Sequence, residues 1–560
     1  MKDREFNLLE EPWIVAMRPD GSTEEVSLPE VFARASEFRR LAGETATQDV
    51  AMLRLLLAVL YTVIARYDED GEEAEVEGFS EALSRWKHIW NQRRFPMEAI
   101  NRYLDAYRDR FWLFDLERPF FQVPASGAVG VKAGGTVDYT EYAVDSMNHE
   151  ISESNNKATR RFFLQRAGEE AKSLNYGEAA RWLVCLMPYD TAVKLKGKEN
   201  LVGIDGEAPK GSKCWLGTFT AVMADGDNLF ETLMMNLVLP SSSNKLTFDG
   251  SPSWEAEKAS VSQHNVIVFP TSPSALYTMQ TRRVSLRREN GKVTGYGEIC
   301  GNVFSGKDTF AEPMAAWTKD TKNEGRLYPR NLRHERQVWR DFSALLMENS
   351  EEGKCPGVVT WLNGLVRKNI LSKSQIRLRT VSAEYDGMGY CLKNISPDSL
   401  TFSAGMLSEK GDAWVSAILN EIKVADALAN QLAYLVVRIS KATGDVNDKT
   451  KKAKESAAKE AAYFAFDIPF REWLEQINPE QDEMSEAAER WWNTSQKIIR
   501  KLGQEIISDA GPQALVGRTV KEKKGNREEE VTYSAPEAYR YFMARTASRK
   551  ALTTGGKKNG

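Results

Sequence analysis

The sequence of 560 residues has few of the residue types that hold metals or form disulfides. It contains only five cysteines and four histidines. The cysteines are widely spaced, none forms a CxxC pair, and no HExxH motif is present. Zinc sites and disulfide frameworks depend on such spacings. We therefore expect reduced thiols mostly in the core, no metal site and no cofactor.

Familiar catalytic and nucleotide-binding motifs are absent as well. The chain has no GxSxG, no GxxxxGK[ST], and no GxGxxG after a predicted strand. Asp225 and Asp227 are the best carboxylate pair for holding Mg²⁺ in a nuclease, but no cluster of acidic residues converges on them. These absences predict a protein that is not an enzyme, with a metal-dependent nuclease as the less favoured alternative.

Long apolar runs are missing too. The longest, residues 51–64, is short for a membrane span and contains Arg54. The first residues, MKDREFNLLEEPW, include no apolar segment typical of a signal peptide. We expect no membrane contact and a cytoplasmic protein.

The residues that are present indicate a well-packed protein with little net charge. Hydrophobic residues make up 42% of the chain, with 14 Trp, and the net charge is −4. Such a composition predicts a large packed core. A protein that binds nucleic acid over its whole surface is usually basic, so any such role here requires local basic patches.

The hydrophobic pattern predicts an α+β protein in two parts. Residues 1–410 mix helices and short strands and form a large mixed α/β N-terminal body, with a strand pair near residues 12–28 and buried helices at 47–67 and 226–239. Residues 411–560 form a C-terminal four-helix bundle. Its helices are predicted at 412–443, 452–477, 480–509 and 534–551.

Basic residues gather in two loop-like regions. The glycine-rich residues 189–217 carry four candidate phosphate contacts, Lys194, Lys196, Lys198 and Lys210. Residues 155–163 combine polar, basic and aromatic side chains. Arginine groups follow at 282–288, 330–340 and 367–379. Lysine and arginine neutralise phosphates, and glycine allows close approach of a backbone to a groove. A solvated surface is the alternative for each group.

Several spaced segments resemble the CasA family, the large subunit of the type I-E CRISPR Cascade surveillance complex. The resemblance covers nearly the whole chain. It rests on NLLEEPWIV at 7–15, ERPFFQV at 117–123, EAARWLVCLMPYDT at 178–191, GDNLFETL at 226–233, and EPM at 312–314 with WRD at 339–341. The resemblance implies a mixed α/β body followed by a helical bundle, and it implies a role in which the protein reads a short motif while base pairing reads sequence.

The resemblance also implies site residues. Lys307 would enter the minor groove beside the protospacer-adjacent motif, and Gly203 and Gly206 belong to the glycine loop. The family's loop at the guide-RNA handle corresponds to residues 155–175. The wedge that parts the first base pair is a glutamine in the best-known members, but here the matching hairpin has Met388 between Gly387 and Gly389. An apolar side chain can also insert between base steps. The expected anchoring residues of the handle loop are Asn156, Arg160, Arg161, Phe162 and Phe163.

The implied partners are the Cascade subunits CasB, CasC, CasD and CasE, the CRISPR guide RNA, double-stranded target DNA, and an effector helicase-nuclease. A structural scaffold that binds only guide RNA and neighbouring subunits is the alternative. The two differ in one measurable property, because only a recognition subunit gives duplex affinity that depends on the motif.

Overall fold

The computed structural model describes most of the chain, in two compact units. Unit 1 consists of residues 1–338, 344–371 and 377–399, and unit 2 consists of residues 339–343, 372–376 and 400–560. The described residues are 4–68, 70–124, 140–147, 171–192, 213–242, 244–257, 267–268, 270–304, 312–320, 326–332, 336–348, 353–387, 389–444, 447–524 and 527–553.

Unit 1 opens with the strand pair and helix start that the sequence predicts. β2 (Ile14–Met17) lies between β3 (Thr23–Val26) and β4 (Arg40–Leu41), and both pairings are antiparallel. α1 (Leu28–Ala33) follows, with Pro29 in its first turn and the Ser27 backbone N–H donating to the Glu30 carboxylate at 2.8 Å. This reciprocal cap satisfies donors that a helix start leaves free.

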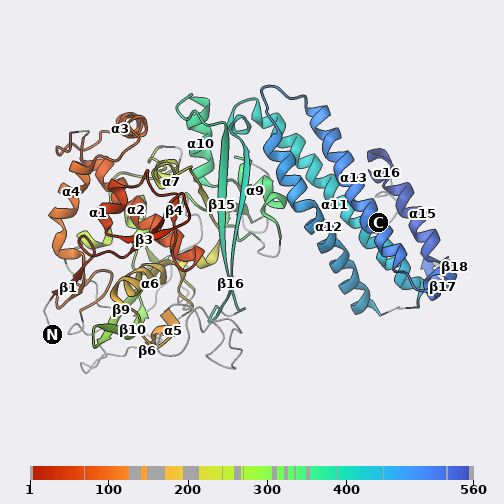
Figure 1. Cartoon of the computed structure of the whole chain (residues 1–560), viewed down its shortest axis with the longest axis horizontal. Coiled ribbons are helices and arrows are strands. Elements are labelled where there is room, and N and C mark those ends of the chain that lie inside the picture. The colour runs from red at the N-terminus through yellow and green to blue at the C-terminus, as the bar shows by residue number, and fades with distance from the viewer. Residues whose placement is uncertain are drawn as a thin grey trace. The chain divides into compact units, whose positions relative to one another are not determined.

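The core of unit 1 is built around α2 (Ala46–Arg66), which packs against α3, α4, α6, α7 and α8 (Figure 1). Its buried, apolar character confirms the helix predicted at 47–67. In the described part of the chain it is the one helix long and apolar enough to cross a membrane by length and composition, and 94% of that apolar window is buried. The prediction that this stretch is too short to span a membrane was therefore wrong. Its apolar side chains are explained by burial inside unit 1.

The remaining helices of unit 1 surround this core. The rings of Trp86 and Trp90 are buried and stack 5.3 Å apart. The helical stretch between residues 79 and 106 is interrupted after Gln92, because Arg93 has φ 55° and Pro96 follows. These helices are α3 (Phe79–Gln92), α4 (Met97–Ala106), α5 (Val144–Met147), α6 (Tyr176–Tyr189), α7 (Leu229–Asn236), α8 (Pro273–Tyr277) and α10 (Gly357–Arg367). The residues of α9 (Phe342–Leu346) are divided between the two units.

Two three-stranded sheets carry the loops considered below. In the first, β10 (Lys292–Cys300) pairs antiparallel with β6 (Thr140–Ala143) and β9 (Arg282–Glu289). In the second, β15 (Gln375–Tyr385) lies between β7 (Ala221–Ala224) and β16 (Leu392–Ser403). Two further sheets have two strands each, β1 (Arg4–Asn7) with β5 (Trp112–Asp115) and β8 (Ile267–Val268) with β11 (Val303–Phe304). A further three-stranded sheet has β12 (Trp317–Lys319) between β13 (Leu327–Pro329) and β14 (Gly353–Lys354).

Unit 2 is largely helical, and its long helices run side by side in Figure 1. Its core contains Phe470, whose ring lies 5.0 Å from that of Trp491 and 4.4 Å from that of Trp339. The predicted α+β class, with a C-terminal helical bundle, is confirmed. The main helices are α11 (Gly411–Ala442), α12 (Asp448–Gln476), α13 (Met484–Ser508) and α15 (Ala535–Arg545).

Two details of unit 2 differ from the sequence prediction. The stretch expected to be irregular contains a short helix and a hairpin, α14 (Pro512–Val516), β17 (Arg518–Lys524) and β18 (Arg527–Tyr533). The last predicted helix ends at Arg545, and α16 (Arg549–Thr553) follows it. The hairpin is rich in lysine and glutamate, so it lacks the apolar alternation by which strands are predicted.

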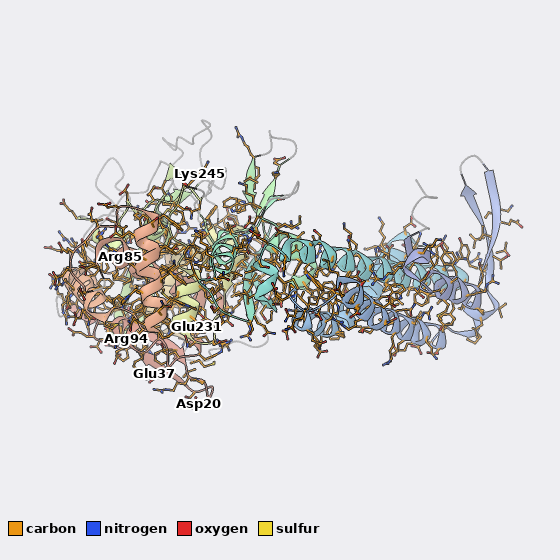
Figure 2. The ribbon with its side chains drawn as sticks, turned by 90° about the horizontal axis from the view of Figure 1, so that it is seen from above. Asp20, Glu37, Arg85, Arg94, Glu231 and Lys245 are labelled. Atoms are coloured by element: carbon orange, nitrogen blue, oxygen red, sulfur yellow. The ribbon has the colours of Figure 1, made fainter. Side chains whose placement is uncertain are left out.

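Side-chain burial follows the expected division between core and surface. Cys185, Cys214, Cys300 and Cys355 are buried, which confirms the prediction that the thiols lie mostly in the core. Burial raises the pKa of the Cys214 thiol to about 12. Charged residues such as Asp20, Glu37 and Arg94 lie at the surface of unit 1 (Figure 2).

Candidate nucleic-acid interface

The first part of the site is the base of the glycine-rich segment. α6 begins with an Asn175–Glu178 capping box and ends at Tyr189. Asp190 follows, and its carbonyl accepts the backbone N–H of Cys214 at 2.9 Å. This hydrogen bond joins the two ends of the segment between residues 193 and 212, so the segment begins and ends at one place in unit 1.

The second part is the tip of the β15–β16 hairpin. The Asp386 carboxylate accepts the backbone N–H groups of Tyr390 at 2.7 Å and Cys391 at 3.2 Å. The Gly389 N–H donates to the Asp386 carbonyl at 3.0 Å, and Gly389 has φ +79°. L-residues with a side chain rarely adopt this conformation, so the turn requires glycine at 389. Asp386 and Gly389 therefore fix the shape of the tip.

These two parts are in direct contact. The Ala192 N–H donates to the Gly389 carbonyl at 2.7 Å. A Cβ placed on Gly389 would lie 3.5 Å from the Ala192 Cβ and 3.7 Å from the Lys213 Cβ. The structure thus brings the base of the predicted glycine loop against the tip of the predicted wedge hairpin.

Tyr385 also holds the hairpin tip and the loop base together. Its hydroxyl donates to the Tyr189 carbonyl, and its ring lies 4.8 Å from the Lys213 ammonium nitrogen. Burial lowers the pKa of Lys213. A Cβ on Gly217 would lie 2.8 Å from the Tyr385 hydroxyl oxygen. The glycine at 217 is therefore explained by packing against Tyr385.

A buried charge cluster holds the loop base to β9. The Arg282 guanidinium lies 2.5 Å from the Asp190 carboxylate and 3.6 Å from the Glu298 carboxylate, and it donates to the Thr191 carbonyl at 2.6 Å. Burial, with the nearby negative charge of Asp190, raises the pKa of Glu298 well above its usual range. One arginine therefore faces two acids, and of these Glu298 has a raised pKa.

The third part of the site is the end of the segment that contains Lys307. Glu312 is the first described residue after it, and its carboxylate accepts two hydrogen bonds from Arg54 of α2, at 2.9 and 3.0 Å. The indole N–H of Trp215 donates to the same carboxylate at 2.8 Å. Because Trp215 follows Cys214 directly, the Lys307 segment ends beside the base of the glycine-rich segment.

Of the site residues predicted from the sequence, Gly387 and Gly389 lie in the described part of the chain. Gly387 has open space around its Cα, while Gly389 is restricted by its backbone. The other predicted residues lie outside the described residues: Lys307, Gly203, Gly206, Met388, Asn156, Arg160, Arg161, Phe162, Phe163, Lys194, Lys196, Lys198 and Lys210.

Several arginines that belong to the basic groups described from the sequence form ion pairs with acidic residues. Arg287 pairs with Glu141, Arg288 with Glu5, Arg377 with Asp225 and Arg379 with Asp49. Such partners are far apart in sequence and could not be foreseen. These pairs give the four arginines structural partners in unit 1, and their expected role as a phosphate-binding surface stays a prediction.

The carboxylates of the nuclease alternative do not form a metal site in the structure. Asp225 is held by Arg39 at 3.3 Å and by Arg377 at 3.4 Å. The Asp227 N–H donates to the Glu231 carboxylate at 3.0 Å, at the start of α7. Within the described ranges, no group of three or more His, Cys, Asp or Glu residues could hold a metal ion.

Sequence reasoning missed the residues that build the interface. Asp386 had a signal, because aspartate followed by glycines is typical of a turn whose side chain accepts backbone hydrogen bonds. Asp190, Arg282 and Glu298 gave no such signal, because 92 residues separate Asp190 from Arg282.

The fold and site define a mixed α/β protein with a helical C-terminal unit, in which the ends of three loop segments converge in unit 1. The family model described as CRISPR-associated protein Cse1 matches residues 7–502, and the chain belongs to this family. A curated relative from Thermus thermophilus, CRISPR-associated protein CasA/Cse1, is 26% identical over 544 residues, covering 92% of this chain and 97% of that protein.

Solved structures show the same fold. The chain matches the Cse1 crystal structure of Thermobifida fusca with a TM-score of 0.80 and 26% identity over 98% of both chains. It matches that of Acidimicrobium ferrooxidans with a TM-score of 0.74 and 24% identity, over 97% of this chain and 98% of the other. A chain of a CRISPR RNA-guided surveillance complex matches with a TM-score of 0.62 and 16% identity, over 97% of this chain and 99% of that chain.

Proposed function

We propose that this Cse1-family protein is the large, non-catalytic subunit of a type I-E CRISPR surveillance complex in the cytoplasm. It assembles there with the guide RNA and with CasB, CasC, CasD and CasE. Membership of the family supports this proposal, as does the likeness of its fold to a chain of an RNA-guided surveillance complex.

In this complex the protein recognises the protospacer-adjacent motif in double-stranded DNA and helps to open the duplex for R-loop formation. The observation that carries this proposal is the convergence of three loop ends, at Ala192 and Lys213, at Glu312 and at Gly389. Segments that start from one place can contact neighbouring base pairs together. Glycines and lysines on such segments suit close approach to phosphates.

Each segment has a separate proposed task. Lys307 enters the minor groove, and Gly203 and Gly206 allow close approach to the duplex. Met388 acts as the wedge between Gly387 and Gly389. Contacts to guide RNA and neighbouring subunits come from residues 155–175, and the bound complex then recruits the effector helicase-nuclease.

The test is the Lys307→Ala variant in the assembled complex. One lost groove contact should weaken binding of motif-bearing duplex roughly tenfold at fixed salt, and lower the salt dependence by about one phosphate contact. Assembly should be intact. Lys87→Ala, on the exposed face of α3, is the matched control and should bind as the unchanged protein does. Unchanged duplex binding by Lys307→Ala would refute the groove assignment.

The same assay separates the two alternatives. A structural scaffold gives equal affinity for duplexes with and without the motif, whichever lysine is changed. A nuclease gives metal-dependent cleavage by the isolated chain that Asp227→Ala abolishes. The ion pairs of Asp225 with Arg39 and Arg377 favour the absence of such cleavage.

A further inference from the structure

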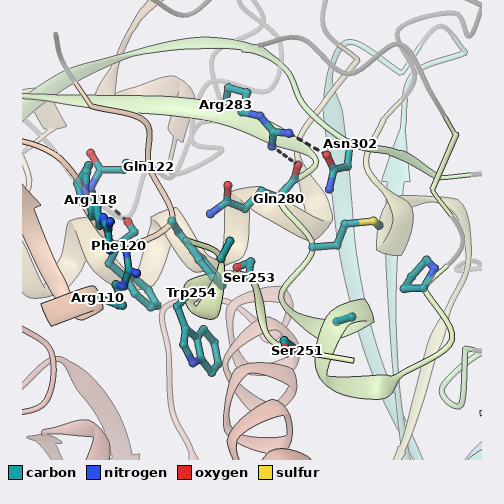
Figure 3. Close-up of a pocket in the computed structure, with 16 residues that line it drawn as sticks. Arg110, Arg118, Phe120, Gln122, Ser251, Ser253, Trp254, Gln280, Arg283 and Asn302 are labelled. Atoms are coloured by element: carbon teal, nitrogen blue, oxygen red, sulfur yellow. Dashed lines mark hydrogen bonds between the residues drawn. The ribbon is translucent and has the colours of Figure 1, made fainter. Parts of the chain in front are cut away.

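A second possible binding site lies in a cavity of about 340 Å³ in unit 1, beside the segment Arg118–Gln122 (Figure 3). Ligand pockets in proteins begin at about this size. Its described lining includes three arginines, Arg110, Arg118 and Arg283, and no aspartate or glutamate. The cavity is therefore positively charged, although the whole chain has a net charge of −4.

Two of these arginines lie together on one side of the cavity (Figure 3). In the part of the chain that the structure describes, neither Arg110 nor Arg118 has a side-chain hydrogen bond or an ion pair. Partial burial and the neighbouring charge of Arg118 lower the pKa of Arg110. The negative charges of Asp109 and Asp115 partly offset the repulsion between the two guanidinium groups, and a bound anion would relieve the rest.

The third arginine approaches from β9. Arg282 and Arg283 are consecutive on this strand, so their side chains point to opposite faces. Arg282 faces Asp190, whereas Arg283 lines the cavity and donates to the Gln280 carbonyl and to the Asn302 side chain, each at 2.8 Å. Burial lowers the pKa of Arg283 to about 10. The cavity thus contains a fixed, buried guanidinium.

The rest of the lining is aromatic and polar. The rings of Phe120 and Phe121 stack at 4.4 Å, and the ring of Phe121 lies 6.3 Å from that of Trp254. Phe121 has φ 52°, a backbone conformation that is costly for a residue with a side chain and that often marks a functional site. The Ser253 hydroxyl is buried, and in the described part of the chain it has no hydrogen-bond partner.

We propose that this cavity binds a nucleotide, with its phosphate on the arginines and its base against the wall formed by Phe121 and Trp254. Guanidinium groups suit phosphate because they donate two parallel hydrogen bonds, and flat aromatic rings suit bases because they stack. The nucleotide is either a free nucleoside monophosphate or one unit of a nucleic-acid strand. The inference goes beyond the proposed function, because it concerns a different cavity and does not require the assembled complex.

Calorimetric titration of the full chain tests the site with four probes: adenosine monophosphate, adenosine, inorganic phosphate and a 5′-phosphorylated single-stranded RNA. The monophosphate should bind at least about tenfold more tightly than phosphate or adenosine, because only it uses both the arginines and the aromatic wall. Arg118→Ala should weaken this binding about tenfold or more. Arg118 is exposed, so the variant should fold. Arg102→Ala, an exposed arginine paired with Glu72 outside the cavity, should bind as the unchanged protein does.

The possible results show whether the site binds a nucleotide at all, and whether that nucleotide is free or part of a strand. RNA that binds and is displaced by the monophosphate identifies a strand as the ligand, whereas monophosphate binding without RNA binding identifies a free nucleotide, and both support the site. Absence of binding by all four probes overturns the proposal. Equal affinity for phosphate and the monophosphate, unaffected by Trp254→Leu, overturns it as well. Motif recognition by the assembled complex is a separate measurement, so either proposal can fail alone.

Discussion

The backbone N–H of Ala192 donates to the carbonyl of Gly389 at 2.7 Å, which joins the base of a glycine-rich segment to the tip of a hairpin 197 positions further along the chain. This hydrogen bond joins two backbone groups, so neither side chain takes part in it. It therefore depends on the backbone geometry of the turn, which Gly389 permits with its φ of +79°. A substitution at Ala192 or Gly389 should therefore affect both the base of the glycine-rich segment and the tip of the hairpin.

Gly389→Ala should disturb this turn. The added Cβ has ordinary space beside Ala192 and Lys213, so the cost comes from the positive φ and amounts to about 1 kcal/mol. Thermal unfolding should show a small loss of stability, and the assembled complex should bind motif-bearing duplex more weakly. Gly387→Ala is the matched control for stability, because a Cβ there meets nothing within 4 Å. Equal behaviour of the two variants would contradict the role given to Gly389.

The sequence predicted those parts of the fold whose signals are local. The apolar run at 47–67 corresponds to α2, and the four C-terminal stretches predicted to be helical correspond to the main helices of unit 2. The β17–β18 hairpin was missed because its strands are mostly charged. The pairing of Arg54 with Glu312 could not be foreseen either, because 258 residues separate the two side chains.

Part of the candidate site was predicted from the sequence, because the family resemblance indicated which hairpin carries the site glycines. Gly387 and Gly389 lie at the hairpin tip, as the turn-forming sequence DGMG indicates. Asp190 and Arg282 hold the loop base to β9, and Tyr385 holds the hairpin to the end of α6. Their partners come from different elements, so only the three-dimensional structure identifies them.

Glu298→Gln should change how stability depends on pH. The pKa of Glu298 is raised in the folded protein by burial and by Asp190, so above about pH 4.3 the unfolded chain loses this proton first. Wild-type stability should then fall with rising pH by up to about 1.4 kcal/mol per unit, until the pH passes the raised pKa. Glutamine mimics the protonated acid, so the variant should gain stability relative to wild type as the pH rises above about 5. Urea unfolding at several pH values measures this, with the exposed Glu257→Gln as control. A difference in stability that does not change with pH would contradict a raised pKa of Glu298.

Removing one partner of the buried Arg54–Glu312 pair should cost far more than removing both. Glu312→Leu leaves the Arg54 guanidinium buried opposite no carboxylate, which typically costs about 3–5 kcal/mol. Arg54→Met combined with Glu312→Leu removes both charges and should recover much of this loss. Chemical denaturation of the three proteins measures the coupling. Glu72→Ala, which breaks the exposed pair with Arg102, should leave stability essentially unchanged. Additive losses in the double variant would show that the two charges do not depend on each other.

Two phenylalanines of α12 differ in burial, and the difference separates a predicted contact surface from the core of unit 2. Phe464 is 81% exposed and lies one helical turn from Ile468, which is 67% exposed, whereas Phe466 is fully buried. Neighbouring exposed apolar side chains often mark a protein interface. In the proposed complex, Phe464→Ala should therefore weaken assembly with the other subunits about tenfold and change stability by less than about 0.5 kcal/mol. Phe466→Ala should instead lower stability by about 3–5 kcal/mol. Analytical ultracentrifugation with the partner subunits and thermal unfolding measure both effects. Normal assembly by Phe464→Ala would show that this face of α12 does not contact a partner.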